Sequence, residues 1–406
     1  MSSIQVFDVG RRAAVRGWLA VAAVTLGIFT VMTAELLPVG LLTPIGGELR
    51  VSDGTAGLMV TVPGLVAAVA APVLAVGAGR LDRRLVLCAL MALVGAAHLL
   101  SAVAGHFAVV LGARVLLGVS IGGFWAFAGG LALRLVPARH VGRATSVIFA
   151  GVSAASVLGV PLGTLTGELG GWRTAFAALG ALALAVLGGL VLLLPPLPAE
   201  RGLSPADLVG LLRSNAGVRT GLALTFLVVT GHFLAYTFVR PLLQGRYGIG
   251  DDLVGVLLLA YGGAGLAGNF LVGGAAARAA RPALLLVAGG LAAVLAALAL
   301  TTGGTAGTLL LLGWGLAFGG VSVGLQSWFL AAAPAATLAA TSLFVAAFCL
   351  SIALGAFLGG RLVDSVSLSA PLWVGAALAL VAAVAVVGAF GHVFIGTTTK
   401  GKETPS

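Results

Sequence analysis

The sequence predicts an all-α membrane protein with twelve transmembrane helices, arranged as two pseudo-symmetric six-helix bundles. Of its 406 residues, 60% are hydrophobic and only 8% are charged, and the mean hydropathy of +1.16 lies far above that of water-soluble proteins. Apolar runs of roughly 20 residues recur along the whole chain, the length that a helix needs to cross about 30 Å of hydrocarbon. Most of the chain is therefore expected inside a lipid bilayer.

Cutting the chain at its clusters of charged, Pro and Gly residues predicts the twelve spans. They cover residues 17–40, 55–78, 84–104, 107–134, 144–168, 173–195, 218–241, 253–276, 282–302, 306–331, 338–363 and 370–392. Arginines before the first run imitate a secretory signal, but that run is too long and contains Glu35. We therefore interpret it as the first transmembrane helix.

The distribution of basic residues predicts the orientation of the spans. With the amino terminus in the cytoplasm, 16 of the 22 Lys and Arg residues fall on the cytoplasmic side. They are Arg11, Arg12, Arg16, Arg80, Arg83, Arg84, Arg134, Arg139, Arg143, Arg201, Arg213, Arg219, Arg278, Arg281, Lys400 and Lys402. Five others fall outside and one lies within a span, so the positive-inside rule favours both termini in the cytoplasm. Frequent Ala, Gly and Arg with just two Lys are typical of a GC-rich bacterial genome, so we expect the bacterial inner membrane.

Composition also bears on the class of function. The net charge of +10 could indicate a nucleic-acid partner, but the arginines fall in short clusters between apolar runs, so we expect none. Cys88 and Cys349 lie within apolar runs, and no CxxC pattern indicates a metal site. We expect no enzymatic activity, no metal and no cofactor, because no nucleophile–base–acid set and no nucleotide-binding loop is visible. An ion gradient, or the substrate itself, would then supply the energy.

The longest polar stretch, residues 196–217, divides the chain into two halves of similar length. It predicts an N-terminal six-helix bundle over 1–195 and a cytoplasmic linker over 196–217. A C-terminal six-helix bundle with a short cytoplasmic tail is expected over 218–406.

Glycine positions indicate that the two halves arose by duplication. An offset of 196 residues carries Gly159 and Gly163 in span five onto Gly355 and Gly359 in span eleven. Parallel halves are a recurrent plan in transporters, which bind the substrate between the halves near the midplane of the bilayer. The pattern therefore favours a transporter.

Three motifs, in the expected order and spans, resemble those of the major facilitator superfamily. Residues 79–84, after span two, resemble a shortened form of its signature loop. In span four, Arg114 precedes Gly118 and Gly122 in a pattern similar to the Arg-x-x-x-Gly motif of proton-coupled members. The glycine-rich run 151–163 in span five looks like the antiporter motif of the exporters.

Segments 33–42, 142–145 and 170–173 more narrowly resemble drug and sugar exporters that include chloramphenicol-resistance and arabinose-efflux proteins. This resemblance implies twelve helices, alternating access and proton antiport, with export of drugs, sugars or metabolites and with multidrug or chloramphenicol resistance. The expected partners are protons, a small-molecule substrate and the lipid bilayer, and we expect a monomer. Two alternatives stay open, namely a proton-independent facilitator or importer on the same fold and a membrane sensor without transport.

Glu35 and Arg114 are the residues that we expect to couple transport to protons. A carboxylate inside an apolar span is costly and usually faces a cavity or an ionisable partner. Desolvation favours its neutral form, so Glu35 could take up a proton outside and release it inside. The always-charged Arg114 could bias Glu35 or the charge of the substrate. The alternatives are a solvated carboxylate near the outer interface for Glu35 and a structural role for Arg114.

The antiporter-like helix carries Gly151, Gly159, Gly163 and Gly167, which are spaced by four or eight residues and so lie near one face. Pro161 removes one backbone hydrogen bond and is expected to bend this helix. One hypothesis is a bending, ion-tight seam between the halves. The other is ordinary close packing of helices.

The loop after span two is expected to act as a conformational latch. Its residues are Gly79, Arg80, Asp82, Arg83 and Arg84. Charge-assisted hydrogen bonds from this loop to the cytoplasmic ends of neighbouring helices would stabilise the outward-facing state. A solvated charged loop is the alternative.

Polar and aromatic side chains in the second half are candidates to line a substrate cavity. They are His232 and Tyr236 in span seven, Asn269 in span eight, and Gln326 and Trp328 in span ten. They could offer hydrogen bonds and an aromatic surface to an uncharged or zwitterionic substrate. Hydrogen bonding between helices is the alternative. His232 could also relay protons near neutral pH, or serve only in packing.

Overall fold

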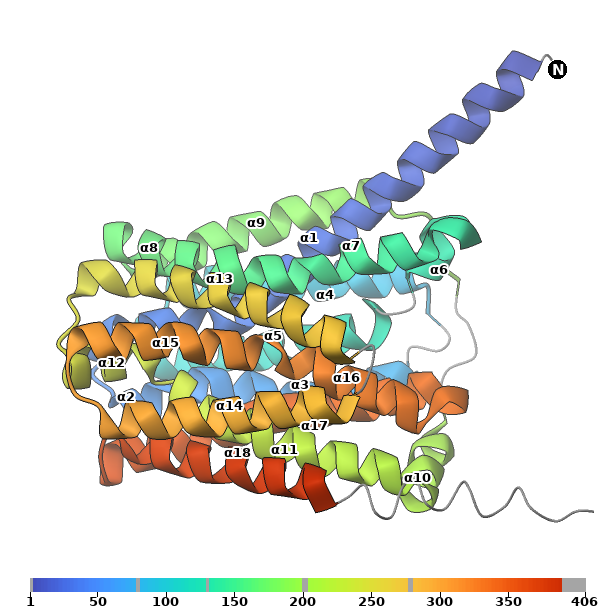
Figure 1. The fold of residues 1–406 in the computed structure, drawn as a ribbon. Helices are drawn as coiled ribbons and strands as arrows, with labels where there is room; N and C mark the ends of the chain where they lie inside the picture. Colours follow the sequence, from blue (N-terminus) through green and yellow to red (C-terminus); the bar gives the residue numbers. More distant parts are fainter. Residues whose placement is uncertain (1–2, 78–80, 129–130, 199–203, 277–279, 389–406) are drawn as a thin grey trace, which may run out of the picture. The chain divides into compact units, whose positions relative to one another are not determined.

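The computed structural model describes residues 3–77, 81–128, 131–198, 204–276 and 280–388 of the chain (Figure 1). Within these ranges the chain is almost entirely helical and contains no strand. Twelve helical segments among the described residues are long and apolar enough to cross a membrane. The predicted all-α membrane fold with twelve transmembrane helices is therefore confirmed.

The chain divides into two compact units, which are described separately. Unit 1 comprises residues 1–202 and 250–259, and unit 2 comprises residues 203–249 and 260–406. Figure 1 labels their helices. The described helices of unit 1 are α1 (Ser3–Leu49), α2 (Asp53–Ala56), α3 (Leu58–Gly77), α4 (Arg83–Ala102), α5 (Phe107–Ala128), α6 (Ala132–Leu135), the 3-10 turn η2 (Ala138–His140), α7 (Val141–Ala154), the π-helical turn η3 (Ala155–Gly159), α8 (Val160–Gly170) and α9 (Trp172–Leu193).

The second half of the chain continues the helical pattern, and α13 (Asp251–Ala276) begins in unit 1 and runs into unit 2. The other described helices of unit 2 are α10 (Pro205–Ser214), α11 (Ala216–Tyr236), α12 (Val239–Tyr247), α14 (Ala280–Leu300), α15 (Gly304–Gly319), α16 (Val321–Ala332), the 3-10 turn η4 (Pro334–Ala336), α17 (Thr337–Ser365) and α18 (Ala370–Gly388).

Helix α1 is longer than the predicted first span, 17–40, and extends past it at both ends. Pro38 and Pro44 lie inside it, although proline lacks an N–H group. Pro38 leaves the carbonyl of Ala34 without its usual donor four residues later. In a membrane protein such a helix continues when a neighbouring helix supplies a replacement donor, and the candidate site contains one.

Span five, predicted as one helix over 144–168, contains a π-helical turn, η3, between α7 and α8. Pro161 lies two residues after this turn. In a regular α-helix the proline ring would clash with the carbonyl four residues earlier, and a wider turn gives it room. The bend expected at Pro161 is therefore accompanied by a change of helix type just before it.

Two further predicted spans are divided. Span seven, predicted over 218–241, ends at Tyr236, and a separate short helix α12 follows it. Span ten, predicted over 306–331, is interrupted at Gly320 between α15 and α16. Such breaks have no hydropathy signal, because the apolar pattern runs through them without change.

The predicted linker, residues 196–217, contains the ten-residue helix α10. Ser204 accepts a hydrogen bond from the backbone N–H of Asp207, and the Asp207 carboxylate accepts one from the backbone N–H of Ser204. This reciprocal capping satisfies two N–H groups at the start of the helix. The hydrogen bonds from Ser204 also lower the pKa of Asp207 below its ordinary value.

Candidate functional site

Glu35 lies in the C-terminal half of α1 and is buried. Its side chain is 2% exposed, and its Oε1 atom has no hydrogen-bond partner among the described residues. An ionised carboxylate in such a place is costly, so the position suits a group that alternates between its neutral and charged forms. The solvated carboxylate considered as an alternative does not fit this geometry.

Arg114 on α5 lies against the same part of α1. Its Nη1 donates a 2.8 Å hydrogen bond to the carbonyl of Ala34, the group that Pro38 leaves without a helical donor. The side chain is 2% exposed, and its Nε and Nη2 have no hydrogen-bond partner in the described part of the chain. Arg114 thus holds the backbone of the residue before Glu35, and the described residues include no ion pair between the two side chains.

Two aromatic rings complete the surroundings of Arg114. Its guanidinium carbon lies 5.0 Å from the centre of the Phe176 ring on α9. The ring of His98, from α4, stacks on Phe176 at 5.6 Å. His98 Nδ1 lies 2.9 Å from the carbonyl of Val94, whereas Nε2 has no partner among the described residues. His98 and Phe176 were not predicted as site residues; a buried histidine in mid-span was the one available signal.

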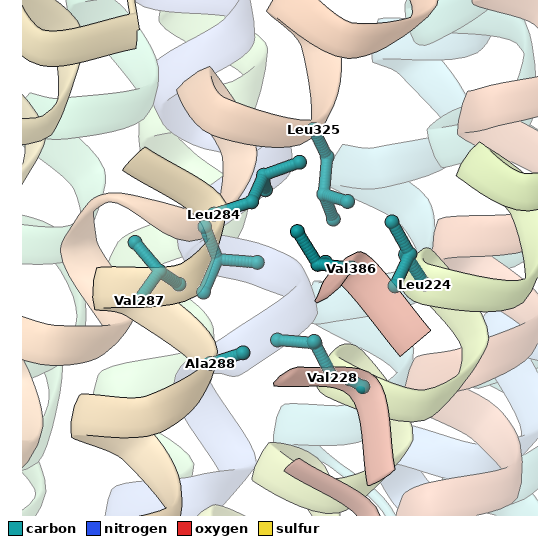
Figure 2. A pocket seen from close by; sticks show the side chains of 9 residues that line it. Leu224, Val228, Leu284, Val287, Ala288, Leu325 and Val386 are labelled. Atoms are coloured by element: carbon teal, nitrogen blue, oxygen red, sulfur yellow. The ribbon is translucent and has the colours of Figure 1, made fainter. Parts of the chain in front are cut away.

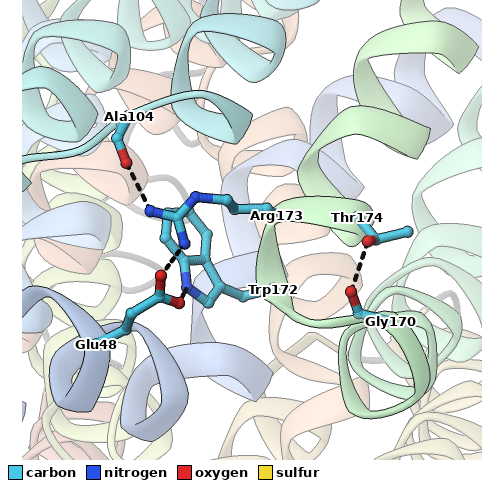
Figure 3. Close-up of polar contacts among 6 residues, drawn as sticks. All are labelled: Glu48, Ala104, Gly170, Trp172, Arg173 and Thr174. Carbon is cyan, nitrogen blue, oxygen red and sulfur yellow. Dashed lines mark hydrogen bonds and ion pairs between the residues drawn. The ribbon is translucent and has the colours of Figure 1, made fainter.

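A polar cluster at one end of α1 anchors the helix that carries Phe176 (Figure 3). Trp172 Nε1 donates a 2.6 Å hydrogen bond to Glu48 Oε2, and Arg173 forms an ion pair with the same carboxylate. Arg173 Nη2 also donates to the carbonyl of Ala104 at 2.8 Å. Gly171, with a φ of 83°, precedes α9 in a conformation that side-chain-bearing residues rarely adopt.

This anchor is connected to the buried site through aromatic contact. Trp172 packs edge-on against Phe176, with ring centres 5.6 Å apart. The chain of contacts therefore runs from Glu48 at the end of α1 through Trp172 and Phe176 to Arg114. The segment 170–173, singled out in the sequence for its family resemblance, thus supports the ring on which Arg114 rests.

The glycines of span five face α1 of the same unit. Thr33 lies opposite Gly159, Leu37 opposite Gly163, and a side chain added at either glycine would collide with these residues. Gly167 faces Leu41, and Gly151 faces the backbone of α1 at Thr25. Pro161 lies on α8, between Gly159 and Gly163 in the sequence. Close packing, the second of the two hypotheses for this face, accounts for the observed contacts.

The latch residues that the structure describes connect the start of α4 to the C-terminal end of α9 and the chain just after it. Asp82 caps α4 by accepting from the N–H of Arg84 at 2.8 Å, and it also accepts from the N–H of Leu197 at 3.0 Å. Arg84 donates to the carbonyl of Val191, and the Arg83 guanidinium lies 5.9 Å from the ring of Phe127. These bonds lie within unit 1. Gly79 and Arg80 lie outside the described residues.

His232 and Tyr236 lie together in an aromatic cluster of unit 2. The other members are Phe233 on α11, Tyr261 on α13, and Trp314 and Phe318 on α15. Trp314 Nε1 donates a 3.0 Å hydrogen bond to His232 Nδ1, and the Tyr236 ring stacks on both His232 and Tyr261. Tyr261 and Trp314 were not predicted as site residues, although a tyrosine or tryptophan inside an apolar span usually needs a polar partner.

The hydrogen bond from Trp314 assigns the protonation of His232. Because Nδ1 accepts, the neutral ring carries its proton on Nε2. His232 Nε2 and the hydroxyl of Tyr261 are both buried, and neither has a partner among the described residues. A second proton, on Nδ1 of His232, would point at the N–H group of Trp314, so that two donors would face each other. This arrangement favours a neutral hydrogen-bonding role for His232 over a proton relay.

The remaining cavity candidates lie elsewhere in unit 2. Trp328 on α16 donates its indole N–H to the carbonyl of Gly217, at 2.9 Å. Gly217 precedes His232 by 15 residues in one helix, a rise of about 22 Å at about 1.5 Å per residue. Trp328 is therefore not part of the aromatic cluster. Asn269 and Gln326 are partly exposed, and no described contact brings them to it.

The aliphatic gap in Figure 2 offers no chemistry for recognition. It is lined by nine side chains from α11, α14, α16 and α18 of unit 2, all of them Leu, Val or Ala. A site without polar groups cannot orient a substrate by hydrogen bonds. Among the described residues, no group of His, Cys, Asp and Glu side chains is placed to hold a metal ion.

Relatives of known name match most of the chain. A sequence profile described as Major Facilitator Superfamily matches residues 24–339. The chain is 34% identical over 370 residues to the purine ribonucleoside efflux pump NepI of Escherichia coli, covering 91% of this chain and 93% of the relative. It is 35% identical over 370 residues to the transcription regulatory protein OpdE of Pseudomonas aeruginosa, covering 90% and 92%.

Solved structures of transporters share the fold. The xylose transporter XylE of E. coli, in a partially occluded inward-open conformation, is similar with a TM-score of 0.72 at 16% identity, covering 93% of this chain and 98% of that one. A bacterial homologue of the human lysosomal transporter Spinster, in an inward-facing conformation, is similar with a TM-score of 0.67 at 16% identity, covering 96% and 99%. At these identities the likeness concerns the fold alone.

Proposed function

This chain belongs to the major facilitator superfamily, and we propose that it exports small organic molecules in exchange for protons by alternating access. The observation that carries the proposal is the position of Glu35, a buried carboxylate in the first membrane helix, whose Oε1 has no hydrogen-bond partner among the described residues. Such a group is stable when neutral and needs water or a cation when charged. Those are the requirements for a side chain that carries a proton between two orientations of a transporter.

Arg114 supports the same cycle. Its buried guanidinium is fixed to the backbone beside Glu35 and rests on Phe176, and two of its nitrogens have no partner among the described residues. In the proposed cycle, Arg114 stabilises the ionised form of Glu35, and protonation removes that attraction. Proton binding would then change which orientation of the carrier is preferred.

A purine ribonucleoside is the first substrate class to test. The relative NepI is named as a purine ribonucleoside efflux pump at 34% identity. The aromatic cluster of unit 2 adds physical support, because planar heteroaromatic rings stack on aromatic side chains. His232 Nε2 and the Tyr261 hydroxyl would offer hydrogen bonds to such a ring. Export of sugars, of other drugs and of chloramphenicol stays a prediction, which the same assay tests.

The proposal extends to the setting of the protein. The chain is a multi-pass membrane protein. We expect it in a bacterial inner membrane, as a monomer. The arginine distribution supports placing both termini in the cytoplasm. Protons and a small-molecule substrate are its expected partners. The proton gradient supplies the energy for transport, and we expect no cofactor.

Inside-out vesicles test the proposal. The vesicles are energised with a proton gradient and challenged with labelled inosine, adenosine, chloramphenicol or arabinose, while substrate uptake and proton release are both recorded. Wild-type protein is expected to accumulate at least one substrate and to release protons as it does so. Glu35→Gln is expected to abolish coupled uptake. Glu48→Gln, which changes an exposed acid on the same helix, is the matched control and should transport normally.

Other outcomes identify the alternatives. Substrate flux that persists when the gradient is collapsed indicates a facilitator and contradicts proton antiport. Absence of flux with every compound favours a membrane regulator, the reading that the name of the relative OpdE supports. That second candidate predicts instead that deleting the gene changes transcript levels, and that Glu35→Gln leaves those levels as in the wild type.

A further inference from the structure

A cluster of basic and aromatic side chains lies where two membrane spans of unit 1 begin. It consists of Arg16 and Trp18 on α1, Arg139 and His140 in η2, and Arg143 on α7, and we refer to it as the basic rim. Arg16, Arg139 and Arg143 are exposed, whereas Trp18 and His140 are half-buried. None of these residues has a role in the proposed transport cycle.

The rim is assembled by close packing of α1 against the chain before α7. Gly17 allows this approach, because a side chain there would collide with the backbone carbonyl of Leu135. The ring of Trp18 then meets His140 edge-on, with centres 6.2 Å apart. The Arg143 guanidinium carbon lies 5.5 Å from the centre of the Trp18 ring.

The charge of the rim has one sign. Arg139 donates from Nε to Nε2 of His140 at 3.1 Å, so its interaction in the rim is with a neutral ring acceptor. The stretch 131–145 contains three arginines and no acidic residue. The rim therefore presents guanidinium groups whose fork geometry matches the oxygens of a phosphate.

The position of the rim identifies its occupant. The spans expected from the apolar pattern, 17–40 and 144–168, both start there, so we expect the rim at the boundary between hydrocarbon and headgroups. Tryptophan is enriched at that depth, and basic residues beside membrane helices attract anionic lipid headgroups. A lipid phosphate is concentrated at this level of the bilayer, whereas a soluble polyanion is not.

We propose that the basic rim binds the phosphate headgroup of an anionic phospholipid such as phosphatidylglycerol. The exposed arginines contact the phosphate, and the half-buried Trp18 packs beside the upper part of the acyl chains. The site is independent of the proposed transport function, since a transporter and a regulator would present the same surface to the bilayer.

Native mass spectrometry of the full chain in a mild detergent tests the proposal. The purified protein is titrated with phosphatidylglycerol and, separately, with phosphatidylcholine of the same acyl chains. Wild-type protein is expected to retain phosphatidylglycerol in preference to phosphatidylcholine. The double substitution Arg139→Gln/Arg143→Gln is expected to weaken phosphatidylglycerol binding by roughly tenfold or more, because each basic residue near an anionic headgroup contributes to the attraction.

A control with equal charge loss separates a local site from the total charge. Arg213→Gln/Arg361→Gln removes two exposed arginines outside the rim and should bind phosphatidylglycerol as the wild type does. The variant Arg139→Lys/Arg143→Lys keeps both positive charges and should retain most of the phosphatidylglycerol binding. It also reports whether the rim folds when both arginines are replaced.

Three results would overturn the proposal. One is equal retention of the two lipids by the wild type. Another is unchanged phosphatidylglycerol binding in Arg139→Gln/Arg143→Gln when the lysine variant shows that the fold is intact. The third is displacement of phosphatidylglycerol by inorganic phosphate or glycerol phosphate that binds with the same affinity as the lipid. That result would assign the rim to a soluble anion.

Discussion

The two halves of the chain use the same packing around different chemistry. In unit 1, glycines of the fifth span receive side chains of α1, with Gly159 opposite Thr33. In unit 2, Gly355 on α17 lies against α11 in the same way, next to the backbone of Thr230. An offset of 196 residues relates Gly159 to Gly355. The close packing between the first and fifth spans is therefore repeated between the seventh and eleventh spans.

The polar groups at these two crossings differ. The first half has a buried acid and a buried base, Glu35 and Arg114. The same offset carries them onto Gly231 and Leu310, which have no charge. Unit 2 has instead the neutral aromatic cluster around His232. Helix contact in lipid depends on small residues, and this feature recurs in both halves. The charged pair does not recur at the positions related by the offset.

Removing the buried base should have the largest effect. Arg114→Leu leaves the carbonyl of Ala34 without a donor and takes the positive charge from beside Glu35. We expect coupled transport to fall by about tenfold or more, and the free energy of unfolding to fall by about 1–3 kcal/mol for the unpaired carbonyl. Proton release and substrate uptake in vesicles measure the first effect, and denaturant titration in detergent measures the second. Normal coupling in both Arg114→Ala and Arg114→Lys would exclude Arg114 from the mechanism.

Two of these glycines, Gly355 of unit 2 and Gly163 of unit 1, should differ in their tolerance of a methyl group. An added Cβ at Gly355 would lie 2.8 Å from the backbone oxygen of Thr230, which cannot move aside, whereas Gly163 faces the flexible tip of Leu37. Gly355→Ala is therefore expected to cost about 1–3 kcal/mol of unfolding free energy, and Gly163→Ala less. Gly188→Ala on α9 has open space and serves as the control. Equal losses at Gly355 and Gly163 would contradict the difference in packing.

Two tryptophans of unit 2 form a matched pair that separates substrate binding from stability. Trp314→Phe removes the donor to His232, and Trp328→Phe removes the donor to Gly217. Each should lower the free energy of unfolding by about 1 kcal/mol, because a buried acceptor loses its partner. Only Trp314→Phe should also raise the KM for a planar substrate. Equal changes of KM in the two variants would remove the aromatic cluster from the substrate site.

The ion pair between Glu48 and Arg173 should contribute least. Their side chains are 52% and 36% exposed, so solvent screens the attraction. Glu48→Gln keeps an acceptor for Trp172 and is expected to cost less than about 1 kcal/mol. Thermal unfolding at low salt and at about 1 M salt measures this, since the difference from wild type should vanish once the Debye length is about 3 Å. A loss that persists in high salt would indicate that the hydrogen-bond geometry, rather than charge, anchors α9.

Motif residues near one another in sequence were predicted as groups, and the structure keeps several of those groups together. Asp82 and Arg84 share one helix start, and Gly159 and Gly163 share one helix face, because spacing along a helix determines these relations. The contacts of Trp328 were not predictable in this way. Its partner Gly217 lies more than a hundred residues earlier in the chain, and no local pattern relates the two.

Hydropathy and motif order alone determined that this chain is a twelve-helix member of its superfamily, because the bilayer acts on each apolar stretch independently of the others. Tertiary structure decided which buried polar groups meet. Pro38 could be recognised as a helix irregularity, but only the packing of α5 against α1 brings Arg114 to the carbonyl that Pro38 leaves free. Likewise, Trp314 finds His232 across 82 residues of sequence, since contacts between helices depend on how they pack rather than on their composition.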